Sequence, residues 1–287
     1  MADPKLKQAL KDGEFVVAPG VFDLISALIA DTIEFKALYV TGYGTVASYL
    51  GLPDAGIATY RDMVERIAQI VKRTTRPVIA DADTGYGGLL NVRYTVQGYE
   101  DVGVTAIQIE DQEFPKKCGH TPNRRVTSLD DMLRKIEVAV DSRRSDDFLI
   151  IARTDSRTGL GLDEAIRRGQ AFAKAGADIV FVESPESIEE MRTIAQSIDA
   201  PLFANIVNGG RTPLLSAETL KEMGYAIAIH PAIGFLSAGA ALRKAYADLH
   251  AHGESSADID LYSFAEFNKL LGFQDVWDFE KRFAQTT

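Results

Sequence analysis

The chain has 287 residues, of which 41 are acidic and 31 basic, so its formal net charge is −10 at pH 7. Hydrophobic residues make up 46% of the sequence and charged residues 25%, as in a globular protein long enough to bury a full core. The charge excludes a protein that binds nucleic acid through clustered basic residues. It does not exclude an anionic small molecule, since a site can be locally basic on an acidic protein.

The sequence contains one cysteine, Cys118. No disulfide can form within the chain, which fits a reducing compartment. The first residues lack the apolar core of a signal peptide, and no apolar run approaches the roughly 20 residues of a membrane span. These features predict a cytoplasmic protein without a membrane partner.

Short apolar runs rich in valine and isoleucine alternate with amphipathic stretches. Runs without polar alternation suit parallel strands buried on both faces, and the amphipathic stretches suit covering helices. Eight such repeats predict a single α/β domain over residues 1–287 with a (β/α)8 TIM-barrel fold; a doubly wound sheet is the alternative. The expected strands are 15–18, 37–41, 78–81, 106–110, 148–153, 179–183, 202–206 and 226–230, and the expected helices are 60–73, 91–102, 128–143, 162–175, 187–197, 216–223 and 234–250.

The C-terminal segment from about residue 253 is rich in aromatic residues, which are not expected to face water. The predicted barrel is already complete before this segment begins. We therefore expect a helical extension that packs against another subunit; the alternative is that it folds back on its own barrel. Its aromatic residues are Tyr262, Phe264, Phe267, Phe273, Trp277, Phe279 and Phe283.

Polar residues end several of the predicted strands, where a (β/α)8 barrel carries its active site. Asp81 and Asp83 point to the same side because side chains alternate along a strand. Charged residues at such positions are costly unless they are paired or bind a ligand. The residues expected to converge are Asp81, Asp83, Glu110, Arg153, Glu183 and Asn205.

Asp81, Asp83 and Glu110 form an all-oxygen set of candidate metal ligands. No cysteine or histidine pair has the spacing of a zinc site, so a hard cation such as Mg²⁺ is favoured. The alternative is a network of salt bridges with Arg153 and lysine residues.

A long loop is expected after the fourth strand, over residues 112–125. A loop of about a dozen residues at an active-site rim is typical of a lid. Lys116 and Lys117 are expected to lower the pKa of the Cys118 thiol and help it to transfer a proton. His120 is too close in sequence to supply the separate histidine of a thiol protease.

Two glycine-rich segments suggest other ligands. Residues 42–47 fit the pattern G-x-G-x-x-A after a strand, but no acidic residue ends the next strand at the distance that dinucleotide binding requires. Residues 208–211 follow the seventh strand, where many barrels bind phosphate, and could equally hold a carboxylate.

The sequence resembles the isocitrate lyase/phosphoenolpyruvate mutase superfamily over about residues 15–247. The Lys-Lys-Cys-Gly-His segment at 116–120 is similar to the lid of its carbon–carbon lyases, the 2-methylisocitrate and 2,3-dimethylmalate lyase group. The other matching segments are Tyr-Val-Thr-Gly at 39–42, Leu-Gly-Leu-Pro-Asp at 50–54, Asp-Ala-Asp-Thr-Gly-Tyr-Gly at 81–87, Ile-Glu-Asp-Gln at 109–112, Ala-Arg-Thr-Asp at 152–155 and Thr-Pro-Leu at 212–214.

The resemblance implies Mg²⁺, with Mn²⁺ as a substitute, held largely through water. Asp83 would be the direct ligand, with Asp54, Asp81 and Glu110 behind it. It also implies a homodimer or homotetramer in which the eighth helix is exchanged between subunits.

The implied reaction is cleavage of a C–C bond in a 2-hydroxy dicarboxylate, of the substituted malate or methylisocitrate type. The products would be a 2-oxo acid (pyruvate or glyoxylate) and a carboxylate. Cys118 would protonate the leaving enolate, Arg153 would neutralise developing charge, and Tyr39 would be the base, oriented by Glu183. Lys117 and His120 are further implied catalytic residues, and the implied substrate-binding residues are Thr41, Gly42, Tyr43, Gly119, Asn205, Thr212 and Pro213.

The sequence departs from the methylisocitrate lyase pattern at Tyr43, because those enzymes usually have Ser-Gly-Gly near position 41. This favours a smaller substituted malate. One alternative is an oxaloacetate hydrolase, which Pro231 disfavours, or an oxaloacetate decarboxylase, which Cys118 disfavours. Another is a phosphonopyruvate-type enzyme such as a carboxyphosphonoenolpyruvate phosphonomutase, which the lid sequence disfavours. A barrel that binds a 2-oxo acid without turning it over is a fourth possibility.

Overall fold

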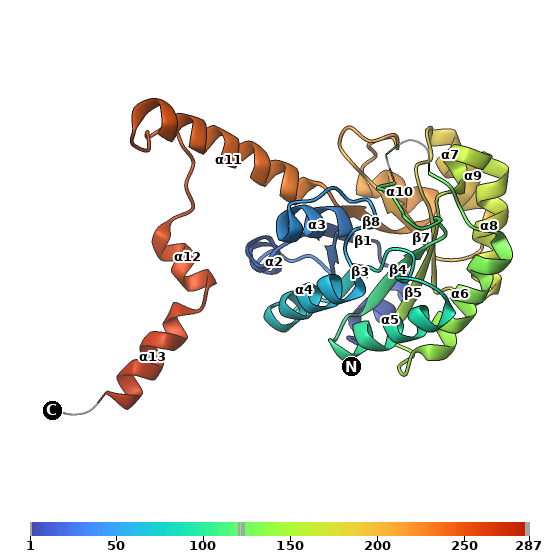
Figure 1. Ribbon diagram of the computed structural model, residues 1–287, viewed down its shortest axis with the longest axis horizontal. Helices are drawn as coiled ribbons and strands as arrows, with labels where there is room; N and C mark the ends of the chain where they lie inside the picture. Colours follow the sequence, from blue (N-terminus) through green and yellow to red (C-terminus); the bar gives the residue numbers. More distant parts are fainter. Residues whose placement is uncertain (1, 120, 122–123, 285–287) are drawn as a thin grey trace. The chain divides into compact units, whose positions relative to one another are not determined.

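The described residues, 2–119, 121 and 124–284 of a computed structural model, form a closed barrel of eight parallel strands in sequential order (Figure 1). The first strand pairs with both the second and the eighth, which confirms the TIM barrel and excludes a doubly wound sheet. The strands are β1 (Val16–Val21), β2 (Leu38–Val40), β3 (Val78–Asp81), β4 (Ala106–Glu110), β5 (Leu149–Thr154), β6 (Ile179–Val182), β7 (Leu202–Asn205) and β8 (Tyr225–His230).

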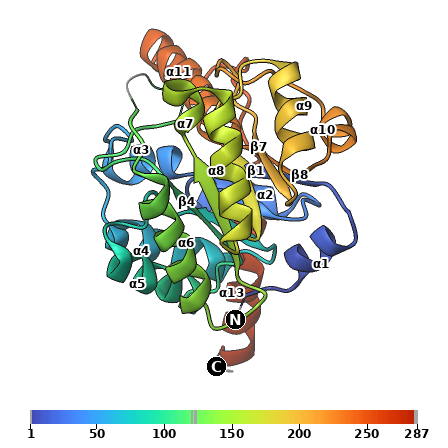
Figure 2. The same ribbon diagram turned by 90° about the vertical axis from the view of Figure 1, so that its right-hand side faces the viewer.

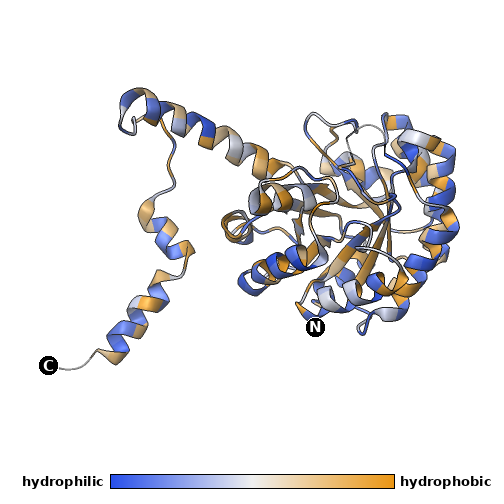
Figure 3. Ribbon diagram, in the orientation of Figure 1, coloured by the Kyte–Doolittle hydropathy of each residue, from blue (hydrophilic) through white to orange (hydrophobic). Residues whose placement is uncertain are grey.

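Helices cover the outer face of the barrel, as Figure 2 shows from a second side. Their apolar faces pack on the strands, so that Ile67, Ile136 and Phe172 are fully buried, whereas their outer faces are hydrophilic (Figure 3). The helices that begin before β8 are α1 (Lys5–Lys11), α2 (Leu24–Asp31), α3 (Gly42–Leu50), α4 (Tyr60–Arg73), α5 (Leu89–Asp101), α6 (Leu129–Ser142), α7 (Ser156–Leu160), α8 (Leu162–Lys174), α9 (Ile188–Ser197) and α10 (Ala217–Met223).

The sequence analysis did not predict α1, α2, α3 or α7, which are short or lack a clear apolar stripe. Residues 42–47, which fit the dinucleotide pattern, lie in α3. Helix α1 contributes Leu6 to the apolar cluster that fills the inside of the barrel together with Ile79, Phe181 and Phe203. The N-terminal helix therefore belongs to the core.

The chain divides into two compact units, residues 1–235 and 236–287. The second unit comprises most of α11 (Ile233–His252), together with α12 (Phe264–Leu270) and α13 (Phe273–Phe283). Within it, aromatic side chains lie close together in pairs, such as Phe273 with Trp277 and Phe279 with Phe283, whose ring centroids are 6.0 and 4.7 Å apart. The division lies near the start of α11, earlier than the expected start of the extension at about 253. Among the described helices none is long and apolar enough to cross a membrane.

Closure of the barrel between β1 and β8 requires a glycine at position 20. A Cβ atom there would lie 2.2 Å from the backbone oxygen of Pro231, and a backbone atom cannot move aside cheaply. We expect Gly20→Ala to lower the free energy of unfolding by about 1–3 kcal/mol, measured by urea denaturation. The control is Gly159→Ala in α7, where the nearest such atom is 3.9 Å away; equal losses in the two variants would contradict this account.

Candidate active site

The inward-facing side chains of the barrel change from mainly apolar to polar at the C-terminal ends of the strands. Alternate residues face the same side of a strand. Each of these polar residues therefore faces inward like the residue two positions before it, which lies deeper in the barrel. All of these strand-end side chains are buried. The pairs, with the deeper residue first, are Tyr39 and Thr41, Ile79 and Asp81, Gln108 and Glu110, Ile151 and Arg153, Phe181 and Glu183, and Phe203 and Asn205.

Arg153 is the centre of this polar layer and forms ion pairs with three carboxylates. Its Nε and Nη2 donate to the two oxygens of Asp155 at 2.8 and 2.9 Å. Its guanidinium also lies 3.4 Å from Glu110 and 3.2 Å from Glu183. Burial lowers the pKa of Arg153, but the three carboxylates outweigh it and hold the pKa well above its ordinary value. The guanidinium therefore stays charged.

Asp155 is held in place by a second buried ion pair behind it. Asp111 accepts the Asp155 backbone N–H at 2.9 Å and the Thr154 hydroxyl at 2.7 Å. Arg168 of α8 donates to the same Asp111 carboxylate at 2.8 Å. A buried carboxylate with these partners fixes the backbone that aims Asp155 at Arg153.

The candidate metal ligands lie beside Arg153, with a lysine among them. The Lys116 ammonium is 2.5 Å from Asp54 and 2.6 Å from Asp83, and all three side chains are at least nine-tenths buried. Asp83 donates its backbone N–H to Asp81 at 3.0 Å and has a φ of 46°, which aspartate tolerates better than most residues. The lysine that joins the acids is thus Lys116.

Burial raises the pKa of Asp83 to about 7, against the opposing effect of Lys116. Burial likewise raises the pKa of Glu110 well above its ordinary value, and Arg153 only partly offsets this. Neighbouring carboxylates add to this effect of burial, since the region holds more negative than positive charge. In this network the carboxylates are Asp54, Asp81, Asp83, Glu110, Asp155 and Glu183, and the cations are Lys116, Arg124 and Arg153.

These residues fit a hard divalent cation. Glu110 Oε1 is buried and accepts no hydrogen bond from any described residue, and the available donors are carboxylate oxygens. Over the described part of the chain, no three Asp, Glu, His or Cys side chains converge closely enough to hold an ion alone. Mg²⁺ typically takes one or two carboxylates and keeps several waters, so this spacing suits it better than zinc or calcium.

The loop after β4 reaches over Arg153 at Gly119. A Cβ atom on Gly119 would lie 2.3 Å from Arg153 Nη2 and 2.9 Å from Glu183 Oε2. Ser184 donates to the Gly119 carbonyl at 3.1 Å, and Cys118 donates its backbone N–H to the Asp54 carbonyl at 3.3 Å. This loop therefore covers the polar layer and places half-buried Cys118 next to it.

One of the predicted lid residues, Lys117, does not join the cluster. Lys117 is exposed, and its backbone N–H donates to the Gln112 side chain at 3.0 Å. The loop turns Lys116 inward instead, so a catalytic role of Lys117 stays a prediction that this arrangement does not support. His120 lies outside the described residues.

The structure argues against Tyr39 as the general base. Burial, followed by the negative charge of Asp81, raises the pKa of the Tyr39 phenol well above its ordinary value. The phenol therefore keeps its proton and lies 3.2 Å from Gln108 Oε1, to which it donates. Its position on the inner face of β2 suits a hydrogen-bond donor and not a proton acceptor.

The predicted substrate-binding residues lie at different depths around the rim. Thr41 occupies the N-cap position of α3 without a side-chain capping hydrogen bond, and Gly42 lies so close to Asp81 that a Cβ atom would be 2.5 Å from its carboxylate. Tyr43 is 42% exposed and stacks on Phe235, with ring centroids 5.2 Å apart. Asn205 donates to Glu183 at 3.0 Å. After β7, Thr212 is buried and Pro213 half-buried.

Sequence reasoning missed three residues of the network: Asp155, Gln108 and Arg124. Asp155 falls one residue beyond the end of β5 but still reaches Arg153. The Gln108 side chain lies 3.5 Å from Asp81. Gln108 is two residues before Glu110 on the same strand, so the alternation of side chains could have indicated that it also faces inward. Arg124 comes from the loop after β4, where no periodic pattern points to the site.

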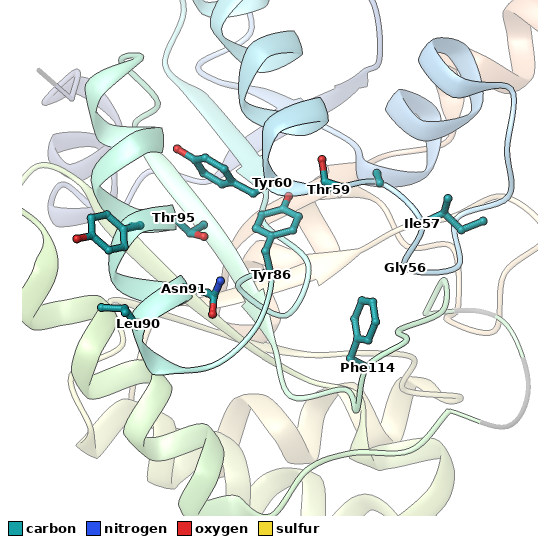
Figure 4. A pocket seen from close by; sticks show the side chains of 11 residues that line it. Gly56, Ile57, Thr59, Tyr60, Tyr86, Leu90, Asn91, Thr95 and Phe114 are labelled. Carbon is teal, nitrogen blue, oxygen red and sulfur yellow. The ribbon is translucent and has the colours of Figure 1, made fainter.

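A separate cavity of about 490 Å³ lies next to the loop and is shown in Figure 4. Phe114 from the loop and Ile57 from the segment before α4 line it, with Tyr86 on its wall. Tyr86 shares a hydrogen bond with Tyr99, which donates to the Asp81 carbonyl at 3.2 Å. Tyr86 and Tyr99 thus connect this cavity to the backbone of one of the acids.

Comparison with known proteins identifies the family. A model described as phosphoenolpyruvate phosphomutase matches residues 6–250. The chain belongs to this family. Among its relatives, 2,3-dimethylmalate lyase of Eubacterium barkeri is 45% identical and 2-methylisocitrate lyase of Aeropyrum pernix is 40% identical. The alignments cover 98% of this chain in both cases, and 97% and 90% of the relatives.

Solved structures of the superfamily have the same fold. A 2,3-dimethylmalate lyase described as a PEP mutase/isocitrate lyase superfamily member has a TM-score of 0.92 and 37% identity, covering 100% of this chain and 97% of its own. Oxaloacetate acetylhydrolase also has a TM-score of 0.92 and 37% identity, and the match covers 96% of this chain and 95% of its own. Phosphonopyruvate hydrolase in complex with oxalate and Mg²⁺ has a TM-score of 0.89 and 29% identity, and the match covers 99% of this chain and 100% of its own. The resemblance to this superfamily is confirmed.

The ion pair behind Asp155 generates a prediction for stability. Arg168→Met leaves the Asp111 carboxylate buried without its cation, which should lower the free energy of unfolding by about 3–5 kcal/mol near neutral pH. Burial already raises the pKa of Asp111 to about 6. Ionisation of Asp111 therefore disfavours the folded state as the pH rises through this value, and the variant should lose less stability at about pH 5 than at about pH 8.

Urea denaturation at both pH values measures this difference. Arg167→Met is the matched control, because Arg167 is 59% exposed and pairs with Glu164 of the same helix. A loss in Arg168→Met that is independent of pH, or no larger than in the control, would show that Asp111 does not depend on this cation.

Proposed function

We propose that this protein is a Mg²⁺-dependent lyase that cleaves a C–C bond of a 2-hydroxy dicarboxylate. The products are a 2-oxo acid, pyruvate or glyoxylate, and a carboxylate. The observation that carries the proposal is the Lys116–Gly119 segment, which lies over Arg153 and Glu183 with Lys116 among the acids. The names of the two relatives, both lyases, support it.

Asp83 would hold the metal, with Asp54, Asp81 and Glu110 around it. When bound, Mg²⁺ supplies a Lewis acid that lowers the pKa of a coordinated substrate hydroxyl. The structure of a similar protein with oxalate and Mg²⁺ supports this cofactor. Lys116 would then shift its ion pairs toward a substrate carboxylate.

Arg153 would bind the oxygen on which negative charge develops as the C–C bond breaks. Its three carboxylate partners fix its orientation before substrate arrives, so little reorganisation is needed in the transition state. The loop with Gly119 excludes water above it. The proton of the substrate hydroxyl would pass to a carboxylate of the buried polar layer. The electron pair of the broken C–C bond would remain on the departing enolate carbon, to which the Cys118 thiol would donate its proton.

The substrate is proposed to be a small substituted malate. Tyr43, stacked on Phe235 at the rim, would take up space that the tricarboxylate methylisocitrate needs. Thr41, Gly42, Asn205, Thr212 and Pro213 would surround the remaining substrate atoms. We also propose a cytoplasmic homodimer or homotetramer whose aromatic C-terminal helices, from about residue 253, meet another subunit, with α11 exchanged between subunits.

The test is release of 2-oxo acid in a coupled assay from a panel of acids. The panel contains 2,3-dimethylmalate, other 2-alkylmalates, 2-methylisocitrate, isocitrate, oxaloacetate and phosphonopyruvate. We expect cleavage of one hydroxy diacid that requires Mg²⁺ and stops with a chelator. Cys118→Ser should lower kcat by about 100-fold or more, as expected for loss of a general acid, with an unchanged thermal unfolding midpoint.

Turnover of oxaloacetate alone, unaffected by Cys118→Ser, would identify a hydrolase similar to the oxaloacetate acetylhydrolase of the same fold. Turnover of phosphonopyruvate alone would place the chain with the hydrolase of that substrate. A Mg²⁺-dependent rise in thermal stability with no turnover of any acid would indicate a binding protein. Each of these results would contradict the proposed lyase.

A further inference from the structure

Arg124 is a buried cation in the second half of the loop that covers the site. Its side chain is 1% exposed, although it comes from a loop and the neighbouring Arg125 side chain is 80% exposed. The Arg124 guanidinium donates to Asp155, whose side chain is completely buried. It also donates to the Thr158 hydroxyl of α7 at 2.6 Å. A loop arginine that is buried and bonded to two side chains does not serve to keep the surface hydrophilic, so its burial calls for another role.

The Asp155 carboxylate joins two guanidinium groups. It accepts both Nε and Nη2 of Arg153 on one side and Arg124 on the other. Arg124 is therefore connected to the centre of the polar layer through one carboxylate. A shift of Arg124 would change the orientation of Asp155, and with it the fork that fixes Arg153.

The first half of the same loop touches Arg153 directly. Gly119 lies so close to Arg153 Nη2 that no Cβ atom would fit there. The two halves are joined at the base by the backbone bond from Glu113 to Arg125, at 2.9 Å, and by the bridge between Gln112 and Val126. Arg153 is thus contacted from above by Gly119 and, through Asp155, from the side by Arg124.

We propose that Arg124 is a positioning residue that couples the seating of the loop to the orientation of Arg153. With Arg124 bonded to Asp155 and Thr158, the loop is held where Gly119 meets Arg153. Without it, Asp155 loses a partner and the second half of the loop loses its buried anchor. The effect on turnover rests on the proposed lyase function, but the effect on the loop does not.

The single cysteine gives a direct measurement of the loop. Cys118 lies between Lys116 and Gly119, so its rate of alkylation by iodoacetamide reports how often this segment leaves the site. We expect Arg124→Gln to raise the rate constant by about tenfold, the change expected when a hydrogen bond between charged groups is lost. The rates are compared on the plateau above the pKa of the thiol, so that only access is measured.

Arg125→Gln is the matched control, since it removes the adjacent charge from the surface. It should alkylate at the wild-type rate. Thr158→Val removes one bond of Arg124 and keeps the residue, so it should give an intermediate rate even if Arg124→Gln does not fold. Arg124→Lys keeps the positive charge but lacks the guanidinium that donates to both Asp155 and Thr158. Its alkylation rate should therefore stay closer to that of Arg124→Gln than to that of the wild type.

If the acid panel yields a substrate, Arg124→Gln should lower kcat by about tenfold with little change in KM, because Arg153 acts mainly in the transition state. If no acid is turned over, the proposed function fails while the alkylation rates still decide the role of Arg124. Equal alkylation rates in wild type, Arg124→Gln and Thr158→Val would overturn this proposal. A rise in Arg125→Gln as large as in Arg124→Gln would overturn it too.

Discussion

The buried guanidinium of Arg153 is the interaction on which the rest of the site depends. It is shared by Glu110, Asp155 and Glu183, so removing the cation would take an ion pair from each of three carboxylates in a region shielded from water. Such clusters contribute little net stability, since desolvation offsets most of the attraction. Their value lies in fixed geometry. Here the geometry presents a cation and several carboxylate oxygens to one small volume above the barrel.

The barrel provides that geometry through strand register. Inward positions are filled by apolar residues such as Phe181 and Phe203 until each strand nears its C-terminal end, where the next inward position is polar. The strands are rigid and paired on both sides, so these side chains cannot drift apart. The loop after β4 adds the groups that the strands lack, namely Lys116 and Cys118. Rigid strands and one covering loop together suit a reaction that develops negative charge away from water.

Much of this arrangement could be predicted from the sequence. Apolar runs gave the eight strands, and the two-residue period gave the convergence of Asp81, Glu110, Arg153 and Glu183. The loop was harder, because no periodicity decides which of two adjacent lysines turns inward. The resemblance pointed to Lys117, whereas the structure buries Lys116.

Other residues depend on long-range contacts that a pattern cannot reveal. Asp54 joins the acids from a loop far away in sequence, and only the resemblance indicated it. Arg124 is buried by Asp155 and Thr158, which are more than 30 residues away. Tyr39 was placed correctly on its strand, but its surroundings, and not its residue type, make it a poor base.

The central claim is that the excess of buried carboxylates forms a site for one divalent cation. Calorimetric titration of the full chain with Mg²⁺ tests it most directly, because it needs no substrate. The account predicts one Mg²⁺ per chain in the wild type and binding at least about tenfold weaker in Asp83→Asn, the loss expected for one charged ligand. No binding by the wild type, or equal affinity in Asp83→Asn, would contradict it.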